Sequence, residues 1–148
     1  MSQDTLPALP PSKLRALAIV LTASPVVLSI ITAVLLGNGT LGAPEPGVVS
    51  IRLILTMIAF VLLGGAFVVR SQVFKRIPTA IPDAQLRLYT LATIGFFAFL
   101  EGTMIVGVLV WLLTRDPLPG VVPAVLAFAL AICSLPSDDQ FEDLCSGR

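Results

Sequence analysis

The sequence predicts an all-α integral membrane protein, a four-helix transmembrane bundle with both termini in the cytoplasm. Three observations lead to this fold class. Hydrophobic residues make up 56% of the 148 residues and charged residues only 12%, whereas roughly a quarter of the residues in soluble domains are charged. The apolar residues gather in four runs that are separated by polar or turn-forming segments. The lysines and arginines lie mostly on one side of these runs, and such asymmetry orients membrane helices.

The first three apolar runs are each long enough to cross a bilayer, because the hydrocarbon core requires roughly 20 helical residues. We expect these helices over residues 14–36, 48–70 and 88–113. Helices are expected rather than strands because lipid cannot satisfy open backbone groups and a barrel would need alternating polarity.

The fourth run, residues 120–135, is shorter and is also predicted to span the membrane. It reaches the required length only by including Pro119 and Gly120 or by crossing a thinned region of the bilayer. A re-entrant or interfacial segment is the alternative.

The chain therefore divides into a polar N-terminal segment (1–12), a four-helix transmembrane domain (13–136) and an acidic cytoplasmic tail (137–148). Only Arg52 and Arg115 fall on the side opposite the other basic residues, which are Lys13, Arg15, Arg70, Lys75, Arg76, Arg87 and Arg148. Because cytoplasmic loops carry the excess of lysine and arginine, this larger group should be cytoplasmic. The expected location is a cell membrane, as a multi-pass protein, most simply the bacterial inner membrane.

The tail begins with a helix-start pattern. Ser137 is placed to act as an N-cap, with Gln140 three residues further on, which is the spacing of a capping box. Phe141 and Leu144 would then form a small apolar face. A tail that docks on a partner and a solvated, frayed end are both compatible with this pattern.

Glu101 is the only charged residue between Leu88 and Leu113. An unpaired, ionised carboxylate at the bilayer midplane costs several kcal/mol, so this side chain must be protonated, paired or open to water. One interpretation is a proton or cation site, or a site for a polar ligand. The other is a structural role, in which Glu101 hydrogen-bonds between helices and fixes their register.

The first helix offers possible partners for Glu101. Pro25 removes one helical hydrogen bond, and Thr22 and Ser24 place hydroxyl groups beside it. These groups lie at a depth similar to that of Glu101. They therefore predict a small polar pocket for a proton, a sodium ion or a water molecule, although a simple proline kink is the alternative.

Arg52 is a further possible partner of Glu101. Counted at about 1.5 Å per residue, the two side chains differ in depth by less than roughly 10 Å. The alternative is that Arg52 extends to the outer membrane interface.

Small residues predict the helix-packing faces. In the fourth run they form one stripe at spacings of four, three and four residues, and in the third run they recur within the apolar sequence. Such stripes let helix backbones approach closely, either inside the bundle or between subunits. The predicted packing residues are Ala98, Gly102, Gly107, Gly120, Ala124, Ala127 and Ala131.

Several functions are not expected. The chain has no histidine and a net charge of zero, which argues against nucleic-acid binding and removes the commonest metal ligand and general base. No catalytic set, metal cluster or cofactor motif is present, and the two cysteines form no paired motif. We therefore expect no enzyme activity, no cofactor and no metal.

Residues 98–110 read Ala-Phe-Leu-Glu-Gly-Thr-Met-Ile-Val-Gly-Val-Leu-Val. This segment resembles the ion-binding helix of rotary ATPase proteolipid (c) subunits, in which a carboxylate lies between small residues and precedes a valine- and leucine-rich run. The resemblance implies that Glu101 carries a proton or a sodium ion. The chain lacks the glycine-repeat helix of that family, and its acid lies on the third helix rather than on the second.

These observations predict a small non-enzymatic membrane protein, most simply a structural or accessory subunit of a larger membrane assembly. Its expected partners are membrane lipids and other membrane subunits or further copies of itself. One alternative is an oligomer that translocates protons or cations through Glu101. Another is a protein that binds a small ligand or a lipid at the pocket beside Pro25.

Overall fold

The computed structural model describes residues 9–39 and 48–146, and all the regular secondary structure in this part of the chain is α-helical. The all-α prediction is therefore confirmed. Most of the predicted N-terminal segment, the connection at 40–47 and residues 147–148 lie outside the described residues. The helices are α1 (Pro11–Gly37), α2 (Val48–Phe74), α3 (Pro82–Thr114), α4 (Leu118–Cys133) and α5 (Asp138–Ser146).

Three helices, α1, α2 and α3, have the length and apolar composition of membrane spans. Helix α4 has 16 residues, which gives a length of about 24 Å and falls short of the roughly 30 Å hydrocarbon core. It meets the requirement only together with α5, from which it is bent by 77°. The described chain thus contains three candidate spans, or four if the bent α4–α5 pair is one.

Each of the four predicted helices has a boundary that differs from the prediction; α1 begins at Pro11 rather than at residue 14, and α2 ends at Phe74 rather than at residue 70. Helix α3 begins at Pro82 rather than at residue 88, because proline suits the first helical position and the helix continues outside the apolar run. Helix α4 occupies 118–133 rather than 120–135. It stops earlier because Leu135 precedes Pro136, and the residue before a proline is disfavoured in helical conformation.

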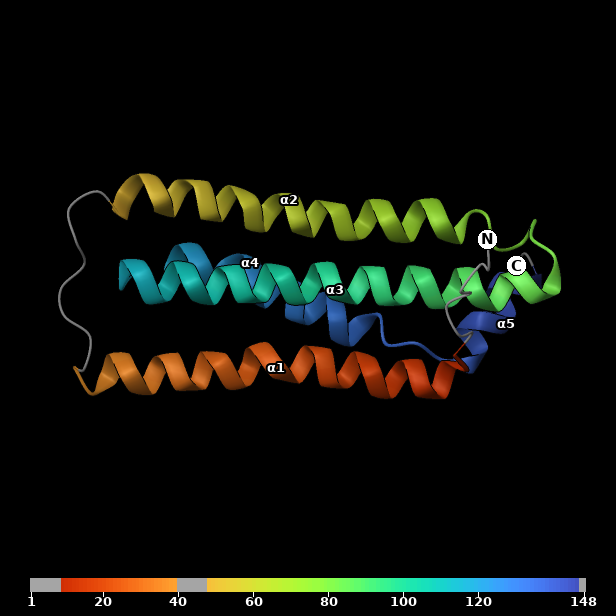
Figure 1. Cartoon of the computed structure of the whole chain (residues 1–148), viewed down its shortest axis with the longest axis horizontal. Coiled ribbons are helices and arrows are strands. Elements are labelled where there is room, and N and C mark those ends of the chain that lie inside the picture. Colours follow the sequence, from red (N-terminus) through yellow and green to blue (C-terminus); the bar gives the residue numbers. More distant parts are fainter. Residues whose placement is uncertain (1–8, 40–47, 147–148) are drawn as a thin grey trace, which may run out of the picture.

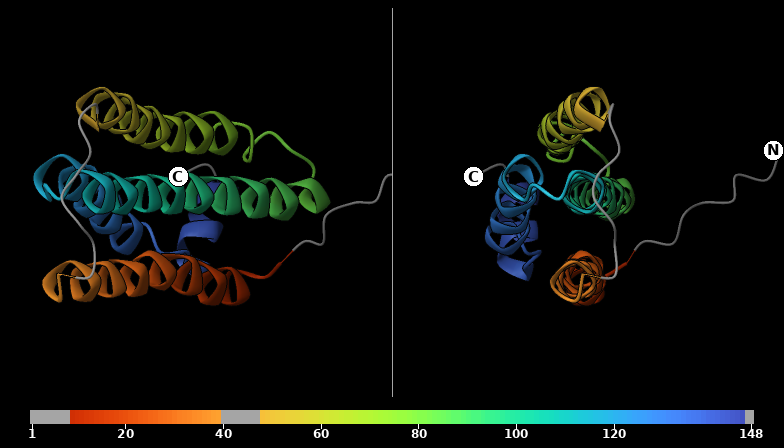
Figure 2. Two further views of the ribbon diagram at one scale, coloured as in Figure 1. Left: turned by 60° about the vertical axis from the view of Figure 1, so that its left-hand side comes forward. Right: turned by 90° about the vertical axis from the view of Figure 1, so that its left-hand side faces the viewer.

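Helix α3 lies in the middle of a row, with α1 on one side and α2 on the other (Figure 1). Helix α4 packs on one face of this row, and the end-on view in Figure 2 shows no helix on the opposite face among the described residues. In the most apolar part of α3, 44% of the residues are buried, compared with 17% in α1 and α2. Helix α3 is therefore the core of the bundle.

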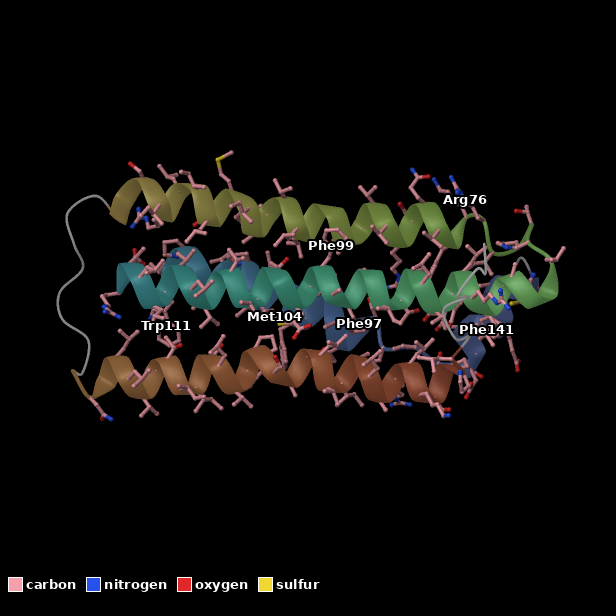
Figure 3. All side chains as sticks on the ribbon, in the orientation of Figure 1. Arg76, Phe97, Phe99, Met104, Trp111 and Phe141 are labelled. Carbon is pink, nitrogen blue, oxygen red and sulfur yellow. The ribbon has the colours of Figure 1, made fainter. Side chains whose placement is uncertain are left out.

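The contact between α2 and α3 is formed by a ring, a glycine and a buried hydroxyl. The side chain of Phe99 extends toward α2 (Figure 3), and a methyl group added to Gly65 would lie 3.0 Å from this ring. Thr103 is fully buried, and its hydroxyl donates to the carbonyl oxygen of Phe99 at 2.9 Å. The threonine is thus satisfied within its own helix while its side chain packs toward Ala59 of α2.

Helices α3 and α4 approach most closely at Gly107 and Gly120. A methyl group added to Gly107 would lie 2.5 Å from the carbonyl oxygen of Gly120, and one added to Gly120 would collide with the backbone of Gly107. No side chain larger than hydrogen fits at either position. On α4 the small residues Gly120, Ala127 and Ala131 are all buried, so the predicted stripe packs inside the bundle.

An aromatic cluster of Phe74, Tyr89 and Phe141 joins α2, α3 and α5. The ring of Tyr89 is fully buried, and its centroid lies 5.8 Å from that of Phe74 and 5.1 Å from that of Phe141. The Tyr89 hydroxyl donates to the side-chain oxygen of Gln140 at 3.3 Å. The tail helix α5 therefore packs on its own chain.

The start of α5 matches the predicted cap. The backbone N–H of Gln140 donates to the hydroxyl oxygen of Ser137 at 3.2 Å, which satisfies one of the unpaired donors of the first turn. Phe141 and Leu144 face the bundle, while Asp138, Asp139, Glu142 and Asp143 are exposed. The predicted N-cap and apolar face are both confirmed.

We predict that Gly120→Ala destabilises the bundle by about 1–3 kcal/mol, because the methyl group forces the α3 and α4 backbones apart. Thermal unfolding in mild detergent, followed by circular dichroism, measures this change. Gly64→Ala is the matched control, since nothing lies within 4 Å of a methyl group added to Gly64. Equal melting temperatures for the two variants would contradict the close crossing.

We predict that Phe141→Ala exposes Cys145, because α5 loses its aromatic contact with Tyr89. Cys145 packs beside the aromatic cluster, and burial raises the pKa of its thiol, which keeps it protonated and slow to react. With Cys133 replaced by serine, maleimide alkylation of Cys145 should accelerate about fivefold, as expected for a loss of roughly 1 kcal/mol. Glu142→Ala, at an exposed neighbouring position, should leave the rate unchanged.

Candidate functional site

Glu101 and Ser24 form a hydrogen-bonded pair between α3 and α1. The Ser24 hydroxyl donates to the carboxyl oxygen Oε1 of Glu101 at 3.2 Å. Ser24 is exposed and Glu101 is only half-buried. Of the four partners predicted from the sequence, Ser24 is the residue that meets Glu101.

The other polar groups near Pro25 are satisfied within α1. The Thr22 hydroxyl donates to the carbonyl oxygen of Ala18, and the Ser29 hydroxyl donates to that of Pro25, each at 2.8 Å. Thr22 and Pro25 are both buried. Because these hydroxyls bond backward along their own helix, they do not join Ser24 in a polar pocket around Glu101.

Arg52 pairs with Asp116 rather than with Glu101. The guanidinium nitrogen lies 3.2 Å from a carboxylate oxygen of Asp116, and each side chain is 40% exposed. Asp116 belongs to the short connection between α3 and α4, and its second oxygen accepts the N–H of Leu118 at 3.1 Å. Within the described residues, Glu101 makes no ion pair.

One face of α3 is left open between α1 and α2, and we call it the uncovered face. Leu91 is 51% exposed and Leu109 is 40% exposed, and Ala98 between them is exposed as well. Gly102 and Ile105 continue this stripe at half-buried positions. These residues point away from α4, which packs against Gly107 on the other side of the helix. Glu101 borders the uncovered face on the side of α1.

The predicted packing residues therefore divide into two groups. Gly107, Gly120, Ala124, Ala127 and Ala131 lie at the α3–α4 contact. Ala98 and Gly102 lie on the uncovered face instead, and a methyl group added to Gly102 would make only an ordinary contact of 3.5 Å with Leu62.

The structure also contains an apolar cavity of about 320 Å³ beside Pro25. It lies among α1, α3 and α4, and neither Glu101 nor Ser24 lines it. The sequence predicted a polar pocket beside Pro25; Pro25 lines this apolar cavity, whereas Thr22, Ser24 and Glu101 do not. The sequence signal that could have indicated this cavity is the set of small residues on α3 and α4. Small side chains allow close helix contacts, but they also leave space between helices.

The described residues contain no group of histidine, cysteine or acidic side chains that is suited to hold a metal. The two thiols are unpaired, with Cys133 exposed and Cys145 half-buried. The best candidate for a functional group in the described part of the chain is thus the Glu101 carboxyl, which accepts one hydrogen bond, from the Ser24 hydroxyl.

Comparison with protein-family models, with curated proteins and with solved structures finds no match to this chain. The resemblance of residues 98–110 to proteolipid subunits therefore stays a prediction.

We predict that the Arg52–Asp116 pair contributes little by itself and that Asp116 matters mainly for the turn. Arg52→Ala should lower the free energy of unfolding by less than about 1 kcal/mol, because the pair is partly exposed. Asp116→Ala should cost about 1 kcal/mol more, since it also removes the acceptor for Leu118 at the start of α4. Thermal unfolding of both variants in detergent measures the difference. A larger loss for Arg52→Ala than for Asp116→Ala would contradict this assignment.

Proposed function

We propose that this protein is a small non-enzymatic subunit of a larger membrane assembly, with a structural or accessory role. In this proposal the uncovered face of α3 packs against a helix of another subunit or of a second copy. The observation that carries it is the Ser24–Glu101 pair, which lies within two candidate membrane spans and is not buried by its own chain.

The energetic argument starts from the surroundings of this pair. Moving a neutral polar group into hydrocarbon without a hydrogen-bond partner costs roughly 2–7 kcal/mol of free energy, and moving an ionised carboxylate costs more. Ser24 supplies Glu101 with one hydrogen bond, and the described chain supplies it with no cation. A neighbouring helix that offers a second polar partner would remove this cost.

The uncovered face suits such a helix. Ala98 and Gly102 flank Glu101 in the sequence and leave the α3 backbone accessible from the open side. Small residues at these positions let a second helix approach closely, and van der Waals contact then drives association within the membrane.

The proposed topology has four crossings and both termini in the cytoplasm of a bacterial inner membrane. Lys13, Lys75, Arg76 and Arg87 all lie near the end of the bundle where α1 begins and α2 gives way to α3, and basic residues favour the cytoplasm. Helix α4 would complete its crossing through the bent segment that leads to α5.

A second candidate function is proton or cation translocation by an oligomer. The observation that favours it is the pairing of Arg52 with Asp116, because it leaves the Glu101 carboxyl without a cationic partner among the described residues. Together with the resemblance to proteolipid subunits, this makes Glu101 a candidate carrier.

We predict that Glu101→Leu weakens the assembly roughly threefold to tenfold, equivalent to about 0.6–1.4 kcal/mol of lost interhelical hydrogen bonding. Glu101→Gln should be tolerated because the amide still accepts from Ser24. The measurement is native mass spectrometry of the protein extracted gently from its own membrane.

The face itself is tested by a matched pair of variants. Ala98→Phe blocks the uncovered face and should release the partner, whereas Val61→Phe, at a 72% exposed position on α2, should not. A wild-type chain that runs alone, without any partner or second copy, would refute the assembly. Loss of proton flux in Glu101→Gln with the assembly intact would favour translocation instead.

A further inference from the structure

The cavity beside Pro25 has a lining that is almost entirely apolar. Ser29 supplies its only hydroxyl group, and this hydroxyl already donates to the carbonyl oxygen of Pro25 at 2.8 Å. Besides this hydroxyl, the polar side-chain group in the lining is the indole N–H of Trp111, so the lining offers water few of the two to four partners that hold it in a cavity. The lining residues are Pro25, Val26, Ser29, Met104, Gly107, Val108, Trp111, Gly120, Val121, Ala124, Val125 and Phe128.

The cavity lies along the interior of two candidate membrane spans. Pro25 and Ser29 are near the middle of α1, and Met104 and Val108 lie well inside α3. Both helices are candidate membrane spans. The medium around the cavity is therefore lipid chains and not water.

The cavity opens to this medium between α1 and α4. Val26 on α1 is 37% exposed and Val125 on α4 is 57% exposed, although both line the cavity. Figure 2 shows α4 beside the row of long helices. The close contact of α4 is with α3, at Gly107 and Gly120, so a crevice remains on the α1 side.

We propose that this cavity binds one acyl chain of a membrane lipid. A transmembrane helix is too thick to occupy it, because a cylinder about 10 Å across would enter a volume of this size for less than one turn. The volume of about 320 Å³ lies at the lower end of the range for small-molecule pockets, roughly 300–1,000 Å³. An apolar, narrow and membrane-facing cavity fits a hydrocarbon chain.

Trp111 provides the test, because it lines the cavity and is the single tryptophan of the chain. Figure 3 shows it on the side of α3 that faces α1. The purified full-length protein in detergent is titrated with a phospholipid that is brominated midway along its acyl chains, since bromine quenches indole fluorescence on contact. We expect quenching that saturates at one lipid per chain.

A double substitution that fills the cavity gives the comparison. Val26→Phe with Val125→Phe places two rings in the lining, and this variant should bind the brominated lipid at least about tenfold more weakly, or about 1.4 kcal/mol. Val27→Phe with Leu126→Phe is the matched control, because both positions are exposed neighbours outside the lining. The control should bind within about twofold of the original chain. Ser29→Leu is a milder filling variant if the double substitution unfolds.

Two outcomes would overturn the proposal. One is quenching that rises in proportion to lipid without saturating, or that is the same in the filled and control variants. The other is a dimer of the original chain in the same detergent that Val26→Phe dissociates, since a second copy would then cover the cavity. The result does not depend on the proposed assembly, because the uncovered face of α3 lies between α1 and α2, away from α4.

Discussion

Helices α1, α2 and α4 all pack against α3, and the closest of these contacts is the backbone approach of Gly107 to Gly120. At this crossing neither helix has room for a methyl group. The contact places α4 on one face of the row α1–α3–α2 and leaves the opposite face open (Figure 2). Both the apolar cavity and the uncovered face follow from this placement, because a single short helix cannot cover both sides of α3.

Most polar groups inside the spans are satisfied locally. Thr22, Ser29 and Thr103 each donate to a backbone carbonyl of their own helix, so they require nothing from a neighbour. Glu101 differs because its hydrogen bond to Ser24 crosses between two helices at an unburied position. In the proposed assembly, this pair is the polar contact that a further helix would cover.

The end of the bundle that carries α5 is held by different forces. Tyr89 stacks on Phe74 of α2 and meets Phe141 of α5 at a tilted angle. The guanidinium of Arg70 lies 5.2 Å and 4.8 Å from the ring centroids of Phe74 and Phe96. An arginine over aromatic faces keeps its charge while its stem covers apolar surface. The acidic side chains of α5 then face outward, so the tail docks through its apolar residues.

Composition and apolar run length were enough to predict an all-α membrane protein, because lipid tolerates few other backbone arrangements. Local chemistry also predicted the Ser137 cap and the α4 packing stripe, since capping and helical spacing involve only neighbouring residues. The partners of Glu101 and Arg52 depended on which helices lie side by side, and depth along a span does not specify that. Tertiary packing decided the rest: the Arg52–Asp116 pair depends on how α2 lies beside the end of α3, whereas the open face of α3 and the cavity beside Pro25 follow from the position of α4 at its two-glycine crossing.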